Sequence, residues 1–145
     1  IKVKNNFALF EPGVYYLGPP GLRLHADALL QGESVMLFLA PGAQMTISGN
    51  APGIDVSGPD SGDYEGVVIF QHRANLLPTD ISGGGLFDVR GTMYMAGAAL
   101  SMDGNVDREI GRIIVSSQQL RGTADYLITG IGHPPGGPKS SYLVK

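Results

Sequence analysis

The feature that most constrains the fold of this chain is the regular return of short apolar segments bounded by glycine, proline, asparagine or aspartate. One apolar position can be followed through five of them: Tyr15, Leu37, Ile69, Met93 and Ile114. The steps between these residues are 22, 32, 24 and 21 positions. A solenoid coil takes about 20 to 30 residues, and insertions loop out on one side. The spacing therefore predicts stacked coils.

The segments are typical of short strands between tight turns. Some alternate apolar and polar side chains, as in Leu22–Leu24, which predicts that one face is in water. Three are continuous apolar runs (Val35–Leu39, Val67–Phe70 and Ile113–Val115), which predicts burial on both faces. The expected strands are 14–17, 22–24, 35–39, 45–48, 54–56, 67–70, 87–89, 92–95, 100–102, 113–115 and 126–128.

Other fold classes fit less well. The best helix candidate, 26–34, does not keep an apolar face at helical spacing. Hairpins in a β-sandwich favour Asn-Gly or Asp-Gly turns, and Asp103-Gly104 is the only such pair. We predict an all-β fold, a single-stranded right-handed parallel β-helix (solenoid) of about five to six short coils. One domain spans 1–145, with 1–10 as an N-terminal arm and 130–145 as a Gly/Pro-rich C-terminal segment that ends in a short strand.

Composition argues against several kinds of partner and site. The net charge is −3 and the ten basic residues are scattered, so we expect no nucleic-acid partner. No apolar run is long enough to span a bilayer, and without cysteine there is no thiolate metal site. The chain opens with Ile1 rather than Met, so we expect a mature product or an excised fragment.

The clearest sign of chemistry is a group of carboxylates, Asp55, Asp60, Asp63 and Glu65, followed by Arg73. Carbohydrate-active β-helix enzymes use clustered carboxylates as acid/base pairs, or to hold Ca²⁺ beside a basic residue. The preferred interpretation is a solvated turn in which aspartate and serine cap the backbone. We therefore expect no catalytic residue, no metal and no cofactor, and the chain is not expected to be an enzyme.

Gln71 and Arg73 end the strongest apolar strand, so their side chains are expected at a coil edge. There they would hydrogen-bond loop backbone. A binding role stays open for them, as it does for Asp63 and Glu65. Histidines and tyrosines are the other residue types that bear on a binding site. The histidines, His25, His72 and His133, lack the spacing in the sequence that metal ligands show. Tyrosines on a flat face could stack on sugar rings, although packing in the core is the simpler expectation for each of them. The tyrosines concerned are Tyr15, Tyr16, Tyr64 and Tyr94.

An ordered set of segments resembles the C-terminal β-helical region of TadG-like proteins, a bacterial family associated with Flp pilus assembly. The resemblance runs from about Glu11 to Thr123, and its most distinctive piece is Ser61–Arg73. Family members often carry a cysteine before the penultimate coil, and this chain has none. The other matching segments are Pro12–Tyr16, Gly32–Leu39, Met45–Asn50, Gly91–Tyr94, Leu100–Asn105 and Ile113–Ser116.

The resemblance implies an exported protein of the bacterial cell envelope, at the cell surface or outside the cell. We expect a non-catalytic scaffold of a surface appendage related to the Tad/Flp pilus, whose partners are other envelope or appendage proteins or itself. One alternative is a self-assembling filament subunit that stacks end to end or exchanges Ile1–Phe10, Tyr126–Thr129 or Tyr142–Val144. The other alternative is a polysaccharide-binding or polysaccharide-degrading β-helix protein.

Overall fold

The computed structural model describes residues 1–4, 6–50, 53–104, 108–123 and 126–128. In these residues the chain forms thirteen strands of one parallel sheet, and the described residues contain no helix. The described residues therefore include no helix that could cross a membrane. The strands are β1 (Lys2–Lys4), β2 (Phe7–Phe10), β3 (Gly13–Leu17), β4 (Gly21–His25), β5 (Leu29–Gly32), β6 (Val35–Leu39), β7 (Gln44–Ser48), β8 (Gly53–Ser57), β9 (Val67–Gln71), β10 (Thr79–Ser82), β11 (Phe87–Gly104), β12 (Arg108–Gly122) and β13 (Tyr126–Ile128).

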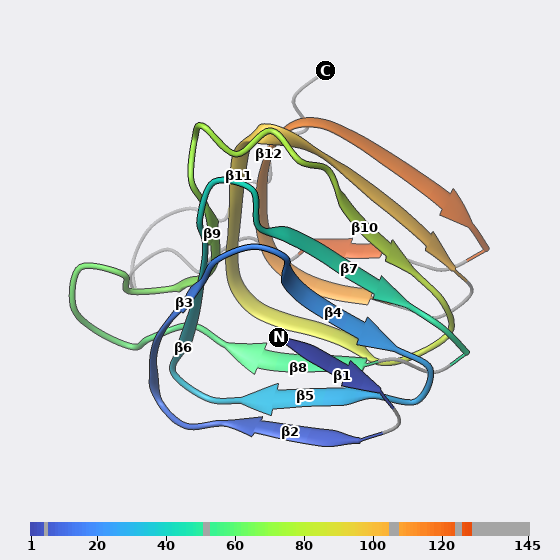
Figure 1. Ribbon diagram of the computed structural model, residues 1–145, viewed down its shortest axis with the longest axis horizontal. Helices are drawn as coiled ribbons and strands as arrows, with labels where there is room; N and C mark the ends of the chain where they lie inside the picture. Colours follow the sequence, from blue (N-terminus) through green and yellow to red (C-terminus); the bar gives the residue numbers. More distant parts are fainter. Residues whose placement is uncertain (5, 51–52, 105–107, 124–125, 129–145) are drawn as a thin grey trace, which may run out of the picture.

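The sheet winds into stacked coils with three faces (Figure 1). The first face contains β1, β4, β7 and β10, the second contains β2, β5 and β8, and the third contains β3, β6 and β9. Strands β11 and β12 bend across all three faces, and β13 continues the second. Every neighbouring pair is parallel, which confirms the predicted parallel β-helix, and its coils number about five, at the lower end of the five to six expected.

The predicted coil spacing is confirmed at its first four positions. Tyr15 pairs with Leu37, Leu37 with Ile69, and Ile69 with Met93. The fifth position was wrong by one residue, because Met93 pairs with Ile113, not with Ile114. The reason is a register shift at the preceding corner, where β11 holds one more residue than β12 between paired positions.

Most of the predicted strands are present, and the structure adds others. Strand β5 lies inside the stretch that was the best helix candidate, and β10 had no strong apolar pattern. The segment 1–10, expected as an arm, contributes β1 and β2 to the first coil. The segment 130–145 lies outside the described residues.

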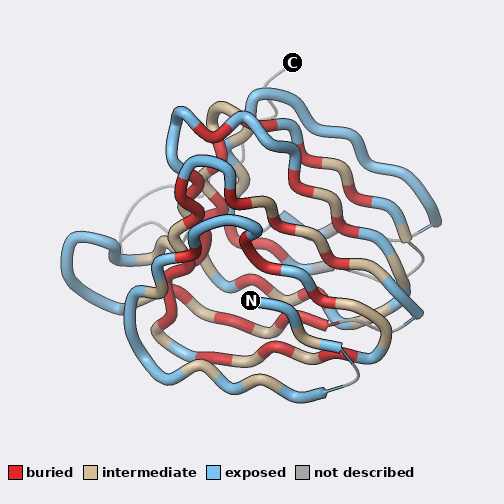
Figure 2. The backbone as a smooth tube through the Cα atoms, viewed as in Figure 1, coloured by how far each residue is buried: buried red, intermediate tan, exposed pale blue. Residues whose placement is uncertain are grey.

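Apolar side chains from the three faces fill one continuous core. Figure 2 marks the buried residues in red along the strands of the coils. Leu24, Ile47 and Met102 are examples of the stacked apolar residues that line its first face, and all three are buried. The prediction of burial on both faces is right in part for β6, in which the outward Met36 is buried and the outward Phe38 is half-buried. It is wrong for 113–115, because Ile114 is 38% exposed on the outer side of β12.

Candidate functional site

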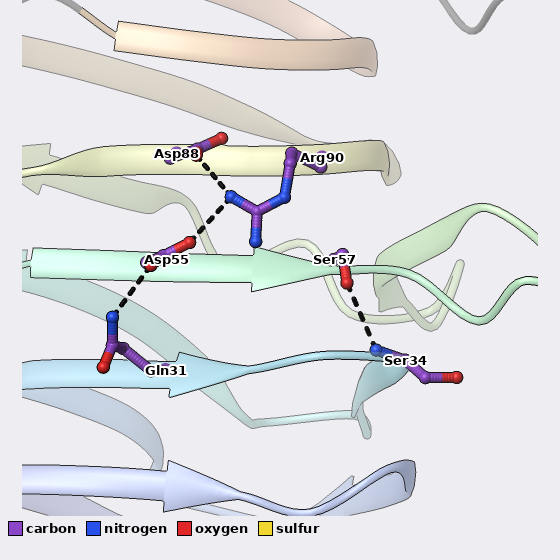
Figure 3. A network of polar contacts seen from close by, with 6 residues as sticks. All are labelled: Gln31, Ser34, Asp55, Ser57, Asp88 and Arg90. Carbon is purple, nitrogen blue, oxygen red and sulfur yellow. Dashed lines mark hydrogen bonds and ion pairs between the residues drawn. The ribbon is translucent and has the colours of Figure 1, made fainter.

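A row of polar side chains runs along the outer side of the second face (Figure 3). Gln31 on β5, Asp55 on β8 and Asp88 on β11 occupy the same position in successive coils. They project outward because their strand neighbours, such as Ile54, fill the core. Parallel strands lie about 4.8 Å apart, so each polar group is within reach of the next.

Arg90 connects the two carboxylates of this row (Figure 3). Its Nη1 atom lies 2.7 Å from Asp55 Oδ1 and also donates to Asp88 Oδ2. Gln31 Nε2 donates to the other Asp55 oxygen at 2.8 Å. Ser57 adds a contact between coils, because its hydroxyl accepts a hydrogen bond from the Ser34 backbone N–H at 3.2 Å. We call Gln31, Asp55, Asp88 and Arg90 the polar ladder.

Contacts within the polar ladder shift the pKa values of Asp55 and Arg90. Burial by itself raises the pKa of Asp55, but hydrogen bonds from Arg90 and Gln31 and the charge of Arg90 outweigh it. The pKa of Asp55 therefore lies below its ordinary value of 3.8. The hydrogen bond to Asp55 is the main reason why the pKa of Arg90 is raised. Among the described residues, Asp88 Oδ1 is buried and accepts no hydrogen bond.

Two open grooves meet at Arg90. The first has a volume of about 440 Å³ and is lined by Asp60, Glu65 and Glu109 beside the guanidinium. One wall is the loop between β8 and β9, closed by a hydrogen bond from Gly66 N to Pro59 O at 2.7 Å. The second groove, about 380 Å³, lies along the earlier coils. Its lining includes Leu9, Glu11, Glu33 and Asp55 as well as Arg90.

The carboxylate group expected from the sequence is divided in the structure. Asp60 and Glu65 line the first groove, whereas Asp63 is exposed in the same loop and does not line it. Arg73 lies beyond the opposite end of β9, where its Nε donates to the Tyr94 hydroxyl at 3.0 Å. The cation beside Asp60 and Glu65 is therefore Arg90, which parallel pairing brings in from another coil.

Gln71 is buried and supports a loop. Its Nε2 donates to the backbone oxygens of Asn75 and Leu77 at 2.8 and 2.9 Å. Asn75, which sequence reasoning missed, is also buried, and its Nδ2 donates to the oxygens of Ala40 at 2.9 Å and Ala43 at 2.6 Å. The Asn75 amide joins the turn after β9 to the turn after β6, and the Gln71 amide holds the first of these turns to the end of β9, so both amides hydrogen-bond loop backbone.

The third face carries a ladder of aromatic rings on its outer side, formed by Tyr16, Phe38, Phe70 and Tyr94. Successive ring centroids are 4.4, 5.5 and 4.9 Å apart, and the planes differ by only 12 to 15°. Because stacked rings cover one another's faces, the inner members present edges to solvent. Stacking on a sugar needs a free ring face, and at the first-coil end of the ladder Tyr16 offers one.

The remaining candidates have local partners or lie apart. His25 Nδ1 is 2.8 Å from the Ser48 hydroxyl, and His72 Nδ1 accepts from a backbone N–H. Tyr15 stacks on Phe10, Tyr64 is exposed in the loop of the first groove, and His133 lies outside the described residues. In the described part of the chain no three histidine, aspartate or glutamate residues are grouped to hold a metal ion.

Chemically, the first groove combines carboxylates with one guanidinium, a set that can hydrogen-bond hydroxyl groups from several directions. Arg90 supplies little net positive charge there, because Asp55 and Asp88 already neutralise it. The surroundings are acidic, which suits a neutral or cationic ligand better than an anion. No family model, curated protein or solved structure matches the chain.

Proposed function

We propose that this chain is a non-catalytic scaffold domain of the bacterial cell envelope, part of a surface appendage related to the Tad/Flp pilus. The appendage setting comes from the resemblance to TadG-like proteins. The scaffold role is supported by the contacts that outward side chains make between successive coils. On two of the three faces these side chains bind the next coil, through the polar ladder and through the stacked rings.

The single observation that carries the scaffold proposal is the position of Arg90. Although Arg90 borders both grooves, its Nη1 is shared between carboxylates of two neighbouring coils, so this guanidinium joins the coils to one another. Such contacts resist bending and shearing between coils. A stiff rod suits a part that holds others at a fixed spacing.

Surface labelling of the source organism tests this proposal. Antibodies raised against the purified chain should label intact cells, and electron microscopy of a deletion strain should show lost or altered appendages. Labelling that appears only after cell lysis would contradict the envelope location. Normal appendages in the deletion strain would contradict the scaffold role.

Polysaccharide binding is the second candidate, and the first groove is the observation that favours it. Asp60, Glu65, Glu109 and Arg90 line one open concavity of about 440 Å³. Calorimetric titration with neutral and amino-sugar polysaccharides should then give binding that Glu65→Gln weakens and Asp63→Asn leaves unchanged. Release of reducing ends in the same mixtures would identify an enzyme.

A further inference from the structure

We propose that copies of this chain bind side by side, through a contact between two segments at opposite ends of β9. The loop before this strand spans 58–66, and we call it the acidic loop. The turn after it spans 72–78, and we call it the leucine turn. Figure 1 shows the acidic loop projecting from the coils, with the leucine turn at the other end of the strand. Both segments lie on the sides of the rod, so coils stacked at either end of it do not cover them.

The leucine turn holds exposed apolar side chains on a fixed backbone. Leu76 is 70% exposed and Leu77 is 39% exposed. The buried amide of Gln71 donates to two backbone oxygens of this turn, and the buried amide of Asn75 ties the turn to the preceding coil. A backbone fixed in this way loses little conformational freedom when a partner binds. Adjacent leucines in water on such a support are typical of an interaction surface.

The surroundings of these leucines are basic. Arg73 is exposed, its Nε donates to the Tyr94 hydroxyl at 3.0 Å, and no ion pair is found for it among the described residues. The leucine turn contains no aspartate or glutamate. The turns that precede it at the same corner, 18–20 and 40–43, contain none either. A partner that fits here therefore combines an apolar group with negative charge.

The acidic loop offers this combination. Tyr64 is 44% exposed and lies between Asp63 and Glu65, which are also exposed. No basic residue occurs in the loop. The loop is closed by a hydrogen bond from the Val67 N–H to the Tyr64 oxygen at 3.0 Å, so its backbone is held as well. An aromatic ring between carboxylates is the complement of leucines beside a guanidinium.

Charge selects a second copy of this chain as the partner. If two leucine turns faced each other, Arg73 would oppose Arg73, and like charges opposite one another are destabilising. With the acidic loop of a second copy on the leucine turn, Tyr64 covers the leucines and the carboxylates face Arg73. An anionic lipid surface would also attract Arg73, but it would repel the acidic loop and a chain of net charge −3.

The contact joins unlike surfaces, so it does not close on itself. Every copy keeps one free acidic loop or one free leucine turn at each end of the assembly, and further copies add there. Because both segments flank the same strand, successive copies lie at the same level along their rods. The expected assembly is an open row of rods, side by side.

Light scattering at increasing protein concentration tests the association. The average mass should start at the 15.2 kDa of one chain and rise past the mass of two, and high salt should weaken the rise. Tyr64→Lys and Leu76→Glu should each raise the dissociation constant at least about tenfold. Leu86→Glu is the matched control: Leu86 is 50% exposed in the turn between β10 and β11, and its replacement should leave the rise unchanged. Circular dichroism shows whether each variant folds, and Leu76→Gln replaces Leu76→Glu if the latter does not.

A mixing experiment tests which surfaces meet. Leu76→Glu keeps its acidic loop and Tyr64→Lys keeps its leucine turn, so each variant alone should be monomeric where the wild type associates. An equal mixture should form pairs and no longer rows. A mixture that stays monomeric overturns the contact, and a wild-type chain that is monomeric at every concentration overturns the association. A monomeric chain that pellets with phosphatidylglycerol vesicles through Leu76 would identify a lipid surface as the partner instead.

The inference rests on the proposed scaffold role only for its setting. Association of the purified chain is measured without cells, so it succeeds or fails separately from surface labelling of the source organism.

Discussion

The Nη1 atom of Arg90 lies 2.7 Å from Asp55 Oδ1, although the two residues are 35 positions apart in the chain. The contact exists because β8 and β11 are neighbours in the sheet and Arg90 pairs with Ser57, two residues beyond Asp55. A guanidinium in this position reaches back across the strand to the carboxylate. Its second carboxylate partner, Asp88, lies on its own strand.

Replacing the cation should weaken the contact between these coils. Arg90→Met leaves Asp55 and Asp88 as like charges on adjacent strands, so we expect the free energy of unfolding to fall by about 1–2 kcal/mol. The loss should shrink in high salt, because the side chains are partly exposed and screened. Urea denaturation at low and high ionic strength measures both effects.

Arg23→Met is the matched control for this prediction. Arg23 is exposed on the first face, and no ion pair is found for it among the described residues. Its replacement should change the free energy of unfolding by only a few tenths of a kcal/mol. Equal losses in the two variants would mean that Arg90 does not hold the coils together.

Stability should also depend on pH through Asp55. Its pKa in the folded chain lies below the ordinary value of 3.8, so folding favours the ionised form. The resulting stabilisation is fully present above the unfolded pKa and is lost as the pH falls through the folded pKa. Denaturant midpoints measured from about pH 5 downward should therefore fall less steeply for Asp55→Asn than for the wild type.

Asp63→Asn provides the comparison for the pH experiment. Asp63 is an exposed carboxylate in the loop before β9, with no ion pair found for it in the described chain. This variant should keep the acid dependence of the wild type. If Asp55→Asn followed the wild-type curve just as closely, the polar ladder would not be the source of the effect.

Much of the fold could be predicted because the coils of a solenoid repeat at a nearly regular spacing in the sequence. Tyr15, Leu37, Ile69 and Met93 align from the spacing alone, since each coil repeats one buried position. The fifth position failed because a corner irregularity leaves no apolar signal. Strand β10 was missed for a related reason: Thr79 is a buried polar residue in a position that other coils fill with leucine or methionine.

The polar sites were less predictable than the fold. Sequence proximity joined Asp63 and Glu65 to Arg73, but a whole strand separates the loop from Arg73. Arg90 was overlooked because its partner Asp55 comes from another coil, and only the register of β8 and β11 brings them together. The apolar positions align successive coils. Extending that alignment to the polar residues between them would have placed Arg90 near Asp55.

The buried amide of Asn75 should be among the most sensitive polar groups. Asn75→Ala removes the donor to the backbone oxygens of Ala40 and Ala43 and the acceptor of the Leu77 N–H. Ala40 O keeps the hydrogen bond from Ala43 N, so the groups that lose this partner without another turn bond are Ala43 O and the Leu77 N–H. We expect a loss of about 2–4 kcal/mol in the free energy of unfolding, because each unsatisfied buried group costs about 1–3 kcal/mol. Chemical denaturation measures it, with the exposed Asn6→Ala as control. A loss as small as that of the control would contradict the interior hydrogen bonds.

The closeness of neighbouring coils can be tested at two glycines with nearly the same backbone angle. Gly21 has φ +93° and Gly62 has φ +91°, so alanine meets similar backbone strain at both. A methyl group at Gly62 has no atom within 4 Å, whereas at Gly21 it would lie 2.1 Å from the backbone oxygen of Gln44 in the next coil. Gly62→Ala should therefore cost only the strain, about 1–2 kcal/mol.

Gly21→Ala should cost roughly 3 kcal/mol or more, because β4 and β7 must also separate where Gly21 pairs with Gln44. Denaturation curves of the two variants, taken side by side, give the difference. That difference isolates the close approach of the coils from the backbone strain that both variants share. Equal losses would show that the first face is not packed as tightly at this corner as the pairing of β4 with β7 requires.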